Sequence, residues 1–447
     1  MKNLITVFVT ILLGIGLFAA NVQPALAQFF GEDGDEDFDE NFEMPEIEYP
    51  SDLNIPKNFR ARVQAEERVN ALKRFSLNLY DILSKDDTNK NKNIICSPWS
   101  TAVILTMLFE GADDETAKEI RKALRFQGPS KHFEKYLYML AFNARATENR
   151  RSAPFIFETR NSFWIKPEND FNEKYVKLLD SRFMTECFHT DFNSDTVAKI
   201  NLWCSENTRQ EINELVSIDD MNPSSRMMIL NAVYFKAGWE MVFDSPTKPE
   251  WFHHDDGSVS KTQMMNQKEV HSMYFESADF KVLRKNYVGN THMLIILPDE
   301  IDGLSELEKT LTPQLLRQID NKLKGETVNV KLPRFSFEHG DDMIPTLKKL
   351  GVNSAFDPKK ANFSKMTDEM GFYIDSMRQK SMIKVDEAGT TAVSVSMSGG
   401  IGGGGWLPPK VYKFYADRPF MFIIRENTDG GILFIGRVHH PEKVADE

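Results

Sequence analysis

The glycine-rich stretch at residues 399–405 is the first pattern in this chain that could bind a ligand. Residues 400–405, with the sequence GIGGGG, satisfy the GxGxxG pattern of dinucleotide-binding turns. In such a site the pattern opens a helix whose N-terminus binds the pyrophosphate. Here it leads directly into Trp406-Leu407-Pro408-Pro409, and no helix opens. We therefore reject a dinucleotide site.

Other residue types that could do chemistry form no constellation. The run His253-His254-Asp255-Asp256 could bind a metal, but no further ligands follow at a defined spacing, so an exposed turn is the better interpretation. The chain has no GxSxG, HExxH or Walker sequence, and its nine histidines form no pattern with a nucleophile. The sequence predicts a protein that is not an enzyme and needs no metal or cofactor.

The remaining candidate is a peptide bond offered to a protease. Residues 385–398 contain no proline and, after Glu387, no charge, so this backbone could pair on both sides inside a sheet. Alternate residues are small on one side and mostly β-forming on the other. The small set is Thr390, Ala392, Ser394 and Ser396, and the other set is Thr391, Val393, Val395 and Met397. Six glycines follow, which predicts an exposed, mobile tip. Two interpretations fit: a strand with a surface loop, or a segment that inserts into a sheet conditionally.

The N-terminus predicts secretion. Residues 1–27 contain Lys2, an apolar run over residues 4–20, and Ala25-Leu26-Ala27 as a small-residue cleavage site, which is typical of a signal peptide. The run is short for a membrane-spanning helix and is interrupted by threonine and glycine. The length of 447 residues and the 41% hydrophobic content predict a globular body with a substantial core. We expect a secreted, extracellular protein that is not inserted in a membrane.

Residues 28–60 are acidic, contain prolines and show no regular period, which predicts a disordered extension. Ten acidic residues and no basic one lie between Glu32 and Glu48. Removing these charges and the positive charge of Lys2 from the total of -12 leaves -3 for residues 51–447. A nearly neutral body argues against nucleic-acid binding. Aromatic residues among the acids could anchor a partner.

The cysteines do not form a disulfide framework. Cys96, Cys187 and Cys204 permit one disulfide at most, and buried free thiols are the commoner outcome at such scattered positions. Core packing must therefore stabilise the fold. The sequon at Asn362 is a candidate glycosylation site on a surface loop.

Periodicity predicts alternating helices and strands. A helical pattern begins near residue 65, a short buried strand covers residues 93–96, and an almost wholly apolar helix covers residues 101–109. A strand over residues 382–385 leads into the loop. Near the C-terminus, strands at residues 420–425 and 433–438 form a hairpin.

Several ordered motifs resemble those of the serpins, over about residues 65–441. They are NIICSPWS at 93–100, Gly111-Ala112 with Thr116 and Glu119-Ile120, NAVYFKAGW at 231–239, MLIILP at 293–298, LPRF at 332–335, DRPFMFII at 417–424 and GGILFIGRVHHP at 430–441. Their number and order identify the chain as a member of this family.

The resemblance implies a mixed α/β (α+β) serpin fold at residues 61–447, with about nine helices and three β-sheets. It also implies an exposed reactive loop, here residues 386–410, between a strand of the main sheet and a neighbouring sheet. Inhibitory members trap a serine protease as an acyl-enzyme when the cleaved loop inserts into the main sheet, a known case of strand addition and strain release. The alternative is a non-inhibitory serpin that acts as a binding, carrier or storage protein.

The resemblance also implies roles for individual residues of the hinge and of the main sheet. The hinge matches Glu387 and Gly389, with Thr390, Ala392, Ser394 and Ser396 as inward positions and Thr391 where glutamate is usual. The polar group beneath the opening sheet matches Ser97, Ser100 and Asn231, with Gln379 in place of the usual histidine, and insertion begins near Trp239 and Arg334. We expect Glu387 to pair with Arg334 in the resting state.

The reactive bond is less sharply defined, because the loop is about five residues longer than usual. Counting from Gly389 gives Gly403-Gly404, whereas counting back from Phe420 gives a bond near Pro408. We favour residues 401–404. The candidates are Ile401, Gly402, Gly403 and Gly404, with Trp406 and Leu407 as sites for a chymotrypsin-like enzyme. An elastase-like enzyme could use Ile401 or the glycines, and a trypsin-like one finds no Lys or Arg between Asp386 and Pro409.

The expected partner is therefore a serine protease bound by a monomeric inhibitor. The acidic extension resembles in composition the tail of heparin cofactor, a serpin whose tail engages a basic protease exosite. Tyr49, flanked by Glu46 and Glu48, is a candidate for sulfation. A solvated tail without a partner is the alternative.

Overall fold

The computed structural model describes residues 57–126, 130–145, 155–222, 224–388 and 410–444. The predicted signal peptide, the acidic extension and loop residues 389–409 lie outside the described residues. Residues 55–447 form one compact unit.

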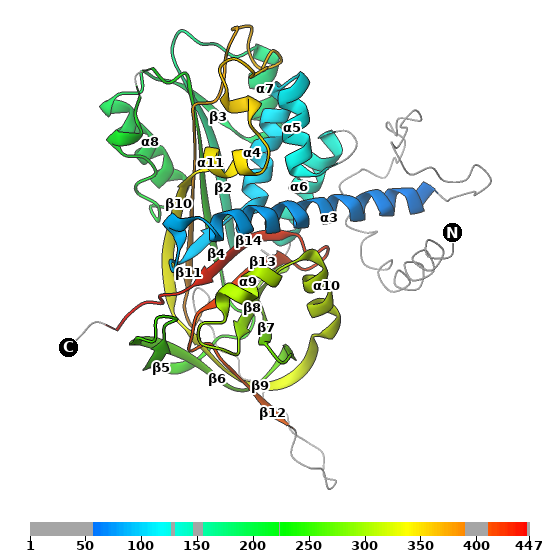
Figure 1. The fold of residues 1–447 in the computed structure, drawn as a ribbon, viewed down its shortest axis with the longest axis vertical. Coiled ribbons are helices and arrows are strands. Elements are labelled where there is room, and N and C mark those ends of the chain that lie inside the picture. The colour runs from blue at the N-terminus through cyan, green and yellow to red at the C-terminus, as the bar shows by residue number, and fades with distance from the viewer. Residues whose placement is uncertain (1–56, 127–129, 146–154, 223, 389–409, 445–447) are drawn as a thin grey trace. The chain divides into compact units, whose positions relative to one another are not determined.

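Nine α-helices lie within the described ranges (Figure 1). They are α3 (Lys57–Ser84), α4 (Pro98–Gly111), α5 (Asp114–Leu124), α6 (Ser130–Arg145), α7 (Glu173–Phe183), α8 (Ser194–Asn207), α9 (Leu304–Thr310), α10 (Pro313–Lys322) and α11 (Met343–Lys349). Helix α4 is buried on nearly every side, as its apolar sequence predicts. It begins at a serine cap, because the Ser97 side chain accepts a hydrogen bond from the Ser100 backbone and Pro98 occupies the first turn.

Five strands form the main sheet, in the order β10-β11-β4-β2-β3. Their bounds are β10 (Phe335–Asp342), β11 (Ser376–Val385), β4 (Met227–Ala237), β2 (Phe155–Ile165) and β3 (Glu186–His189). Strands β11 and β4 are parallel, with Gln379 opposite Asn231, whereas β10 pairs with β11 and β2 with β4 in antiparallel fashion. The centre of the main sheet is therefore a parallel pair.

The other nine strands form one hydrogen-bonded sheet in the order β1-β14-β13-β8-β7-β6-β9-β12, with β5 paired to β6. They are β1 (Ile94–Cys96), β5 (Asp244–His253), β6 (Val259–Glu276), β7 (Phe280–Asn286), β8 (Thr291–Pro298), β9 (Lys324–Pro333), β12 (Val411–Tyr415), β13 (Phe420–Glu426) and β14 (Ile432–Val438). The expected mixed α/β fold is confirmed, but only two sheets are separate among the described residues, where three were expected. The reason is β6, an 18-residue strand that pairs with β5, β9 and β7 and so joins them in one sheet, with a register shift between Gln267 and Val270.

The main sheet is buried on both faces at its centre. Along β4, Ile229 and Val233 belong to the large core, whereas Leu230 and Ala232 belong to a smaller cluster that includes Trp203 of α8. Because helices and the second sheet cover both faces of the main sheet here, apolar residues occur on both sides of its central strands. The three cysteines are free, as the sequence suggested, and Cys96 and Cys204 are buried.

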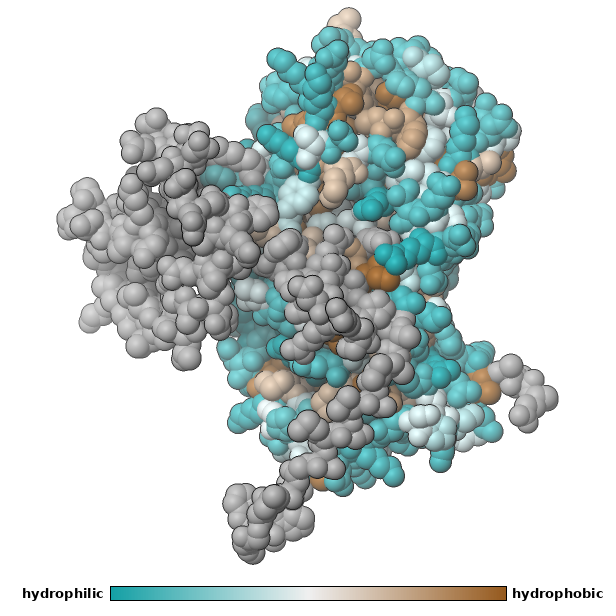
Figure 2. Space-filling model, turned by 180° about the vertical axis from the view of Figure 1, so that it is seen from behind, coloured by the Kyte–Doolittle hydropathy of each residue, from teal (hydrophilic) through white to brown (hydrophobic). Residues whose placement is uncertain are grey.

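The surface is hydrophilic over most of the described part of the face in Figure 2, and hydrophobic residues form small separate areas there. Among the described helices, none combines the length and the hydropathy that crossing a membrane would require.

Gly436 of β14 tests the packing between strands. A Cβ at this position would lie 2.3 Å from the Ile94 carbonyl oxygen and 2.6 Å from Cζ of Phe422. Because neither the backbone nor the buried ring can move freely, we expect Gly436→Ala to lower the free energy of unfolding by about 1–3 kcal/mol or more. Urea unfolding followed by circular dichroism measures this change.

Gly340→Ala in β10 is the matched control. There the nearest atom is Cγ of Lys380 at 3.3 Å, so a Cβ requires a shift of only a few tenths of an ångström. Equal unfolding midpoints for the two variants would contradict the close packing of β14.

Candidate functional site

The ends of the predicted reactive loop lie in different sheets. Strand β11 of the main sheet ends at Val385, and strand β12, which follows the loop, begins at Val411 and pairs with β9 in parallel. Figure 1 shows β12 at the pole of the molecule shared by β5, β6 and β9. The loop therefore connects the centre of one sheet to an edge of the other.

A buried polar group joins β11, β4 and α4 beneath the main sheet. The Gln379 amide donates to Oδ1 of Asn231 at 2.8 Å, across the boundary between the two parallel strands. The Asn231 amide in turn donates to Oγ of Ser100 at 2.7 Å. All three residues are at most 4% exposed. Three of the four side chains that the resemblance assigned to this polar group are thus directly connected.

Three further residues complete this network, and none of them was predicted from the sequence. Asn231 also donates to Oδ1 of Asn161 at 2.8 Å, and the Ser100 hydroxyl lies 2.8 Å from that of Thr159. Thr101 exchanges hydrogen bonds with the Gln379 amide. Thr159 and Asn161 are alternate residues of β2, within the polar stretch at residues 158–162, and this polar stretch between apolar residues was the available signal.

Ser97 has a different place from the one expected. Its hydroxyl caps α4 and donates to the carbonyl oxygen of Leu433 at 2.9 Å. It therefore supports Ser100 through the start of the helix and connects α4 to β14. No hydrogen bond links its side chain directly to Asn231 or Gln379 in the described residues.

The expected ion pair between Glu387 and Arg334 is present at the end of β11. Arg334 Nε lies 2.8 Å from both carboxylate oxygens, and Nη2 lies 2.6 Å from Oε1. The Thr247 hydroxyl donates to the same carboxylate. Partial burial alone would raise the pKa of Glu387, but these hydrogen bonds and the positive charge of Arg334 outweigh it and hold the pKa below its ordinary value.

The backbone of the hinge is held by residues 239–243, which we call the clamp segment. The Trp239 indole donates to the carbonyl oxygen of Asp386 at 2.9 Å, and the Trp239 backbone N–H donates to the carbonyl oxygen of Ala388 at 3.1 Å. The Phe243 amide donates to the Glu387 carbonyl at 3.0 Å. Trp239 itself stacks on Tyr287, with 4.3 Å between ring centroids. Trp239 thus lies where the resemblance placed it, against the first residues of the loop.

The remaining hinge and cleavage candidates lie outside the described residues. They are Gly389, Thr390, Thr391, Ala392, Ser394, Ser396, Ile401, Gly402, Gly403, Gly404, Trp406 and Leu407.

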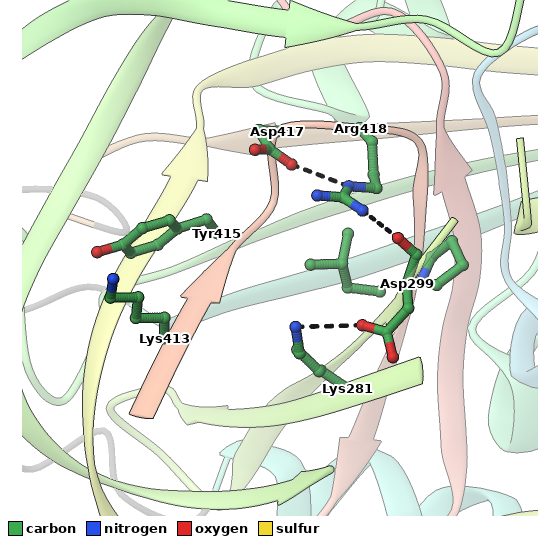
Figure 3. Close-up of a pocket in the computed structure, with 8 residues that line it drawn as sticks. Lys281, Asp299, Lys413, Tyr415, Asp417 and Arg418 are labelled. Carbon is green, nitrogen blue, oxygen red and sulfur yellow. Dashed lines mark hydrogen bonds and ion pairs between the residues drawn. The ribbon is translucent and has the colours of Figure 1, made fainter. Parts of the chain in front are cut away.

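A small cavity of about 200 Å³ lies beside β12 (Figure 3). Lys281 and Asp299 pair there at 3.1 Å, and Arg418 bonds to Asp417 at 2.9 Å and to the Asp299 carbonyl. The acidic groups that line the cavity are thus already paired with bases. Its lining residues include no Ser, Cys or His that could act as a nucleophile or its base.

The turn expected at residues 253–256 is only partly exposed. His254 is buried, and its ring nitrogens bond to the His439 carbonyl oxygen at 3.1 Å and to Ser260 Oγ at 2.8 Å. Burial lowers the pKa of His254. These bonds attach the C-terminal segment to the start of β6, so this histidine has a structural role. No cluster of three metal-ligating side chains occurs in the part of the chain that the structure describes.

Asn362 is half-buried, in the segment between α11 and β11. Its side-chain nitrogen Nδ2, the atom to which a glycan would be attached, donates to Oδ2 of Asp114 at 2.9 Å.

Comparisons with known proteins agree with the motifs. The family model described as Serpin (serine protease inhibitor) matches residues 70–441. Human neuroserpin is 31% identical over 384 residues, which cover 83% of this chain and 91% of neuroserpin. The native structure of tengpin, a thermophilic serpin, aligns with a TM-score of 0.72 at 31% identity, covering 88% of this chain and 96% of tengpin. Human thyroxine-binding globulin complexed with thyroxine aligns with a TM-score of 0.75 at 25% identity, covering 85% and 100%.

The bond across the parallel strands can be tested with Gln379→Leu. This change leaves Oδ1 of Asn231 buried without its donor, which we expect to lower the free energy of unfolding by about 1–3 kcal/mol. Met377→Leu, at a buried apolar position of the same strand, is the control and should cost less than about 1.5 kcal/mol. Chemical unfolding measures both. Gln379→Leu as stable as the control would show that the bond contributes nothing to closing the sheet.

Proposed function

Because this chain belongs to the serpin family of serine protease inhibitors and is not an enzyme, we propose that it traps a serine protease as a suicide substrate. The protease serine attacks a loop peptide bond, an ester to the new C-terminal residue forms, and the amine of the following residue leaves with a proton. The loop then inserts into the main sheet, carrying the esterified protease with it before water can hydrolyse the ester.

The observation that carries the proposal is the parallel pairing of β11 with β4 immediately before the loop. A segment that follows β11 and turns back between the two strands would run antiparallel to both. Insertion would therefore replace one parallel ladder of eight residue pairs by two antiparallel ladders, which are somewhat more stable per residue. Insertion of the loop would thus add backbone hydrogen bonds to the main sheet while the rest of the fold stays the same.

The sequence of the loop suits this insertion. Residues pointing to the inside of the main sheet enter a close-packed core, so small side chains are needed there. Thr390, Ala392, Ser394 and Ser396 are small and uncharged and alternate as a strand requires. The polar bond between Gln379 and Asn231 must break when the strands separate, so it resists insertion until the loop is cleaved.

Target specificity is proposed from the loop sequence. We place the cleaved bond within residues 401–404, which suits an elastase-like enzyme, with Trp406 and Leu407 available to a chymotrypsin-like one. Lys410, the first described residue after the loop, is exposed and its ammonium lies over the Tyr412 ring at 4.1 Å. Covalent trapping of a trypsin-like protease through cleavage after Lys410 would overturn this assignment.

Secretion is also part of the proposal, and it rests on the signal-like residues 1–27. We propose Asn362 as the glycosylated residue, provided that its bond to Asp114 yields to the glycan. Edman sequencing of the mature protein from the native host and mass spectrometry of the Asn362 peptide test both points.

A carrier or binding role is the second candidate. The likeness to human thyroxine-binding globulin in complex with thyroxine favours it, because that structure shows a protein of the same fold holding a small ligand. A carrier would be cleaved in the loop without retaining the protease.

Mixing the mature protein with trypsin-, chymotrypsin- and elastase-like enzymes separates the two roles. Trapping predicts a complex that resists SDS and boiling, together with a released C-terminal peptide whose mass identifies the bond. Cleavage without a complex for every enzyme would favour the carrier.

Thr390→Arg tests insertion itself. Inserting this residue would bury a charge without a partner, at a cost of several kcal/mol, so deacylation should overtake insertion. We expect the stoichiometry of inhibition to rise several-fold as the inhibitor becomes a substrate. Thr391→Arg, at the adjacent position facing the other side, is the control and should change the stoichiometry little. An unchanged stoichiometry in Thr390→Arg would exclude insertion.

The acidic extension is proposed to steer a protease with a basic surface. A tethered acidic tail raises the local concentration of its partner, and salt screens the attraction. Removing residues 1–50 should therefore slow association at low salt, with little change at high salt and none in stoichiometry. Equal association rates for the full mature and shortened proteins at every ionic strength would leave the extension without this role.

A further inference from the structure

A lysine is buried directly behind the clamp segment. Lys285 of β7 is 6% exposed, and its ammonium donates to the carbonyl of Met241 at 2.8 Å and to Oε1 of Gln267 at 2.7 Å. It also lies 4.2 Å from the ring centroid of Phe243 and 5.2 Å from that of Trp239. Neither the motifs nor the proposed function accounts for this residue.

Lys285 and the hinge contact opposite sides of the same few residues. On one side, Lys285 binds the Met241 carbonyl and lies against the rings of Trp239 and Phe243. On the other side, Trp239 and Phe243 donate three hydrogen bonds to the backbone of residues 386–388. A change in the clamp segment caused by Lys285 is therefore transmitted to the hinge by direct contacts.

The ammonium is held by neutral groups alone. Two amide oxygens and two aromatic faces surround it, and no carboxylate of the described residues lies within ion-pair distance. Cation–π contacts and hydrogen bonds offset part of the cost of removing the charge from water, but a buried cation without a counter-ion stays unfavourable. Opening the clamp segment would return the ammonium to water.

We propose that Lys285 is a positioning residue of the hinge, whose buried positive charge destabilises the closed clamp segment and so favours release of residues 386–388. This proposal rests on the proposed loop insertion for its biological meaning, because release of the hinge must precede insertion. The physical effect on the clamp segment can be measured without a protease.

The direction of the pH effect follows from linkage. Burial lowers the pKa of Lys285 to about 7, against a small opposing effect of Asp244. Water contact in the open state would return the pKa toward about 10.4. The open state then binds more protons than the closed one between these values, so opening is favoured as pH falls from about 10 to 7 and levels off below 7.

Other titratable groups around Lys285 are already engaged. Glu240 accepts from Asn286, Glu387 pairs with Arg334, and Asp244 accepts from the Lys268 amide. His292 of β8 bonds instead to Asn427 and contacts Arg425. Burial raises the pKa of Tyr287, which stays neutral over this range.

Hydrogen–deuterium exchange of the peptide that contains residues 239–243 tests the proposal. The exposed Lys268 provides a matched control on the neighbouring strand β6. After correction for intrinsic exchange, the opening constant of the wild-type protein should rise as pH falls from 9 to 7, by up to about tenfold per pH unit. In Lys285→Met it should be smaller at pH 7 and independent of pH. Lys285→Leu is the second variant should the methionine protein fold poorly.

Two more variants separate charge from packing. Lys268→Met should behave as the wild type, and Lys285→Arg, charged throughout, should keep the opening constant high and flat. A wild-type constant that does not change with pH, or that equals that of Lys285→Met at pH 7, would overturn the proposal. A protein that traps no protease yet shows the expected exchange would refute only the inhibitory function.

In a protein that does trap a protease, Lys285→Met should also insert its loop more slowly and show a higher stoichiometry of inhibition at pH 7. An unaltered stoichiometry, together with reduced opening, would show that the clamp segment does not limit insertion.

Discussion

The parallel pairing of β11 with β4 is the constraint on which the rest of this structure depends. It places a ladder of lower stability at the centre of the main sheet, directly before a long loop. The ladder is closed from beneath by side chains, because Gln379 bonds to Asn231 across it and Asn231 bonds to Ser100 of α4. Breaking this buried network exposes or orphans several polar groups at once. This network therefore holds the two parallel strands together.

The hinge contributes a second closure at the end of the same ladder. Glu387 is fixed to Arg334, and the backbone of residues 386–388 is fixed to the clamp segment. These contacts hold the start of the loop outside the sheet. Since they involve one ion pair and a few backbone bonds, they can be lost locally while the core around β4 remains packed.

The two closures differ in their chemistry. The polar group under the ladder is made of neutral amides and hydroxyls, so changes of pH affect it little. The hinge contains ionisable groups, with Glu387 on its surface and Lys285 behind the clamp segment. Of these two closures, the hinge is therefore the one in which a change of pH alters charges.

The sequence by itself determined the family, the fold class and the pairing of Glu387 with Arg334, because the motifs, their order and the alternation of side chains can be read directly from the residues. It also indicated the buried helix α4 and the C-terminal hairpin of β13 and β14. It did not indicate β5 and β10, whose residues include Pro246, Pro249 and Gly340 and lack a clear alternation. Only the tertiary structure brought Thr159 and Asn161 to Asn231, buried His254, and placed Lys285 against Trp239. The two bonds of His254, for example, reach residues 6 and 185 positions away along the chain. No local sequence pattern specifies which distant side chain will contact a given buried polar group.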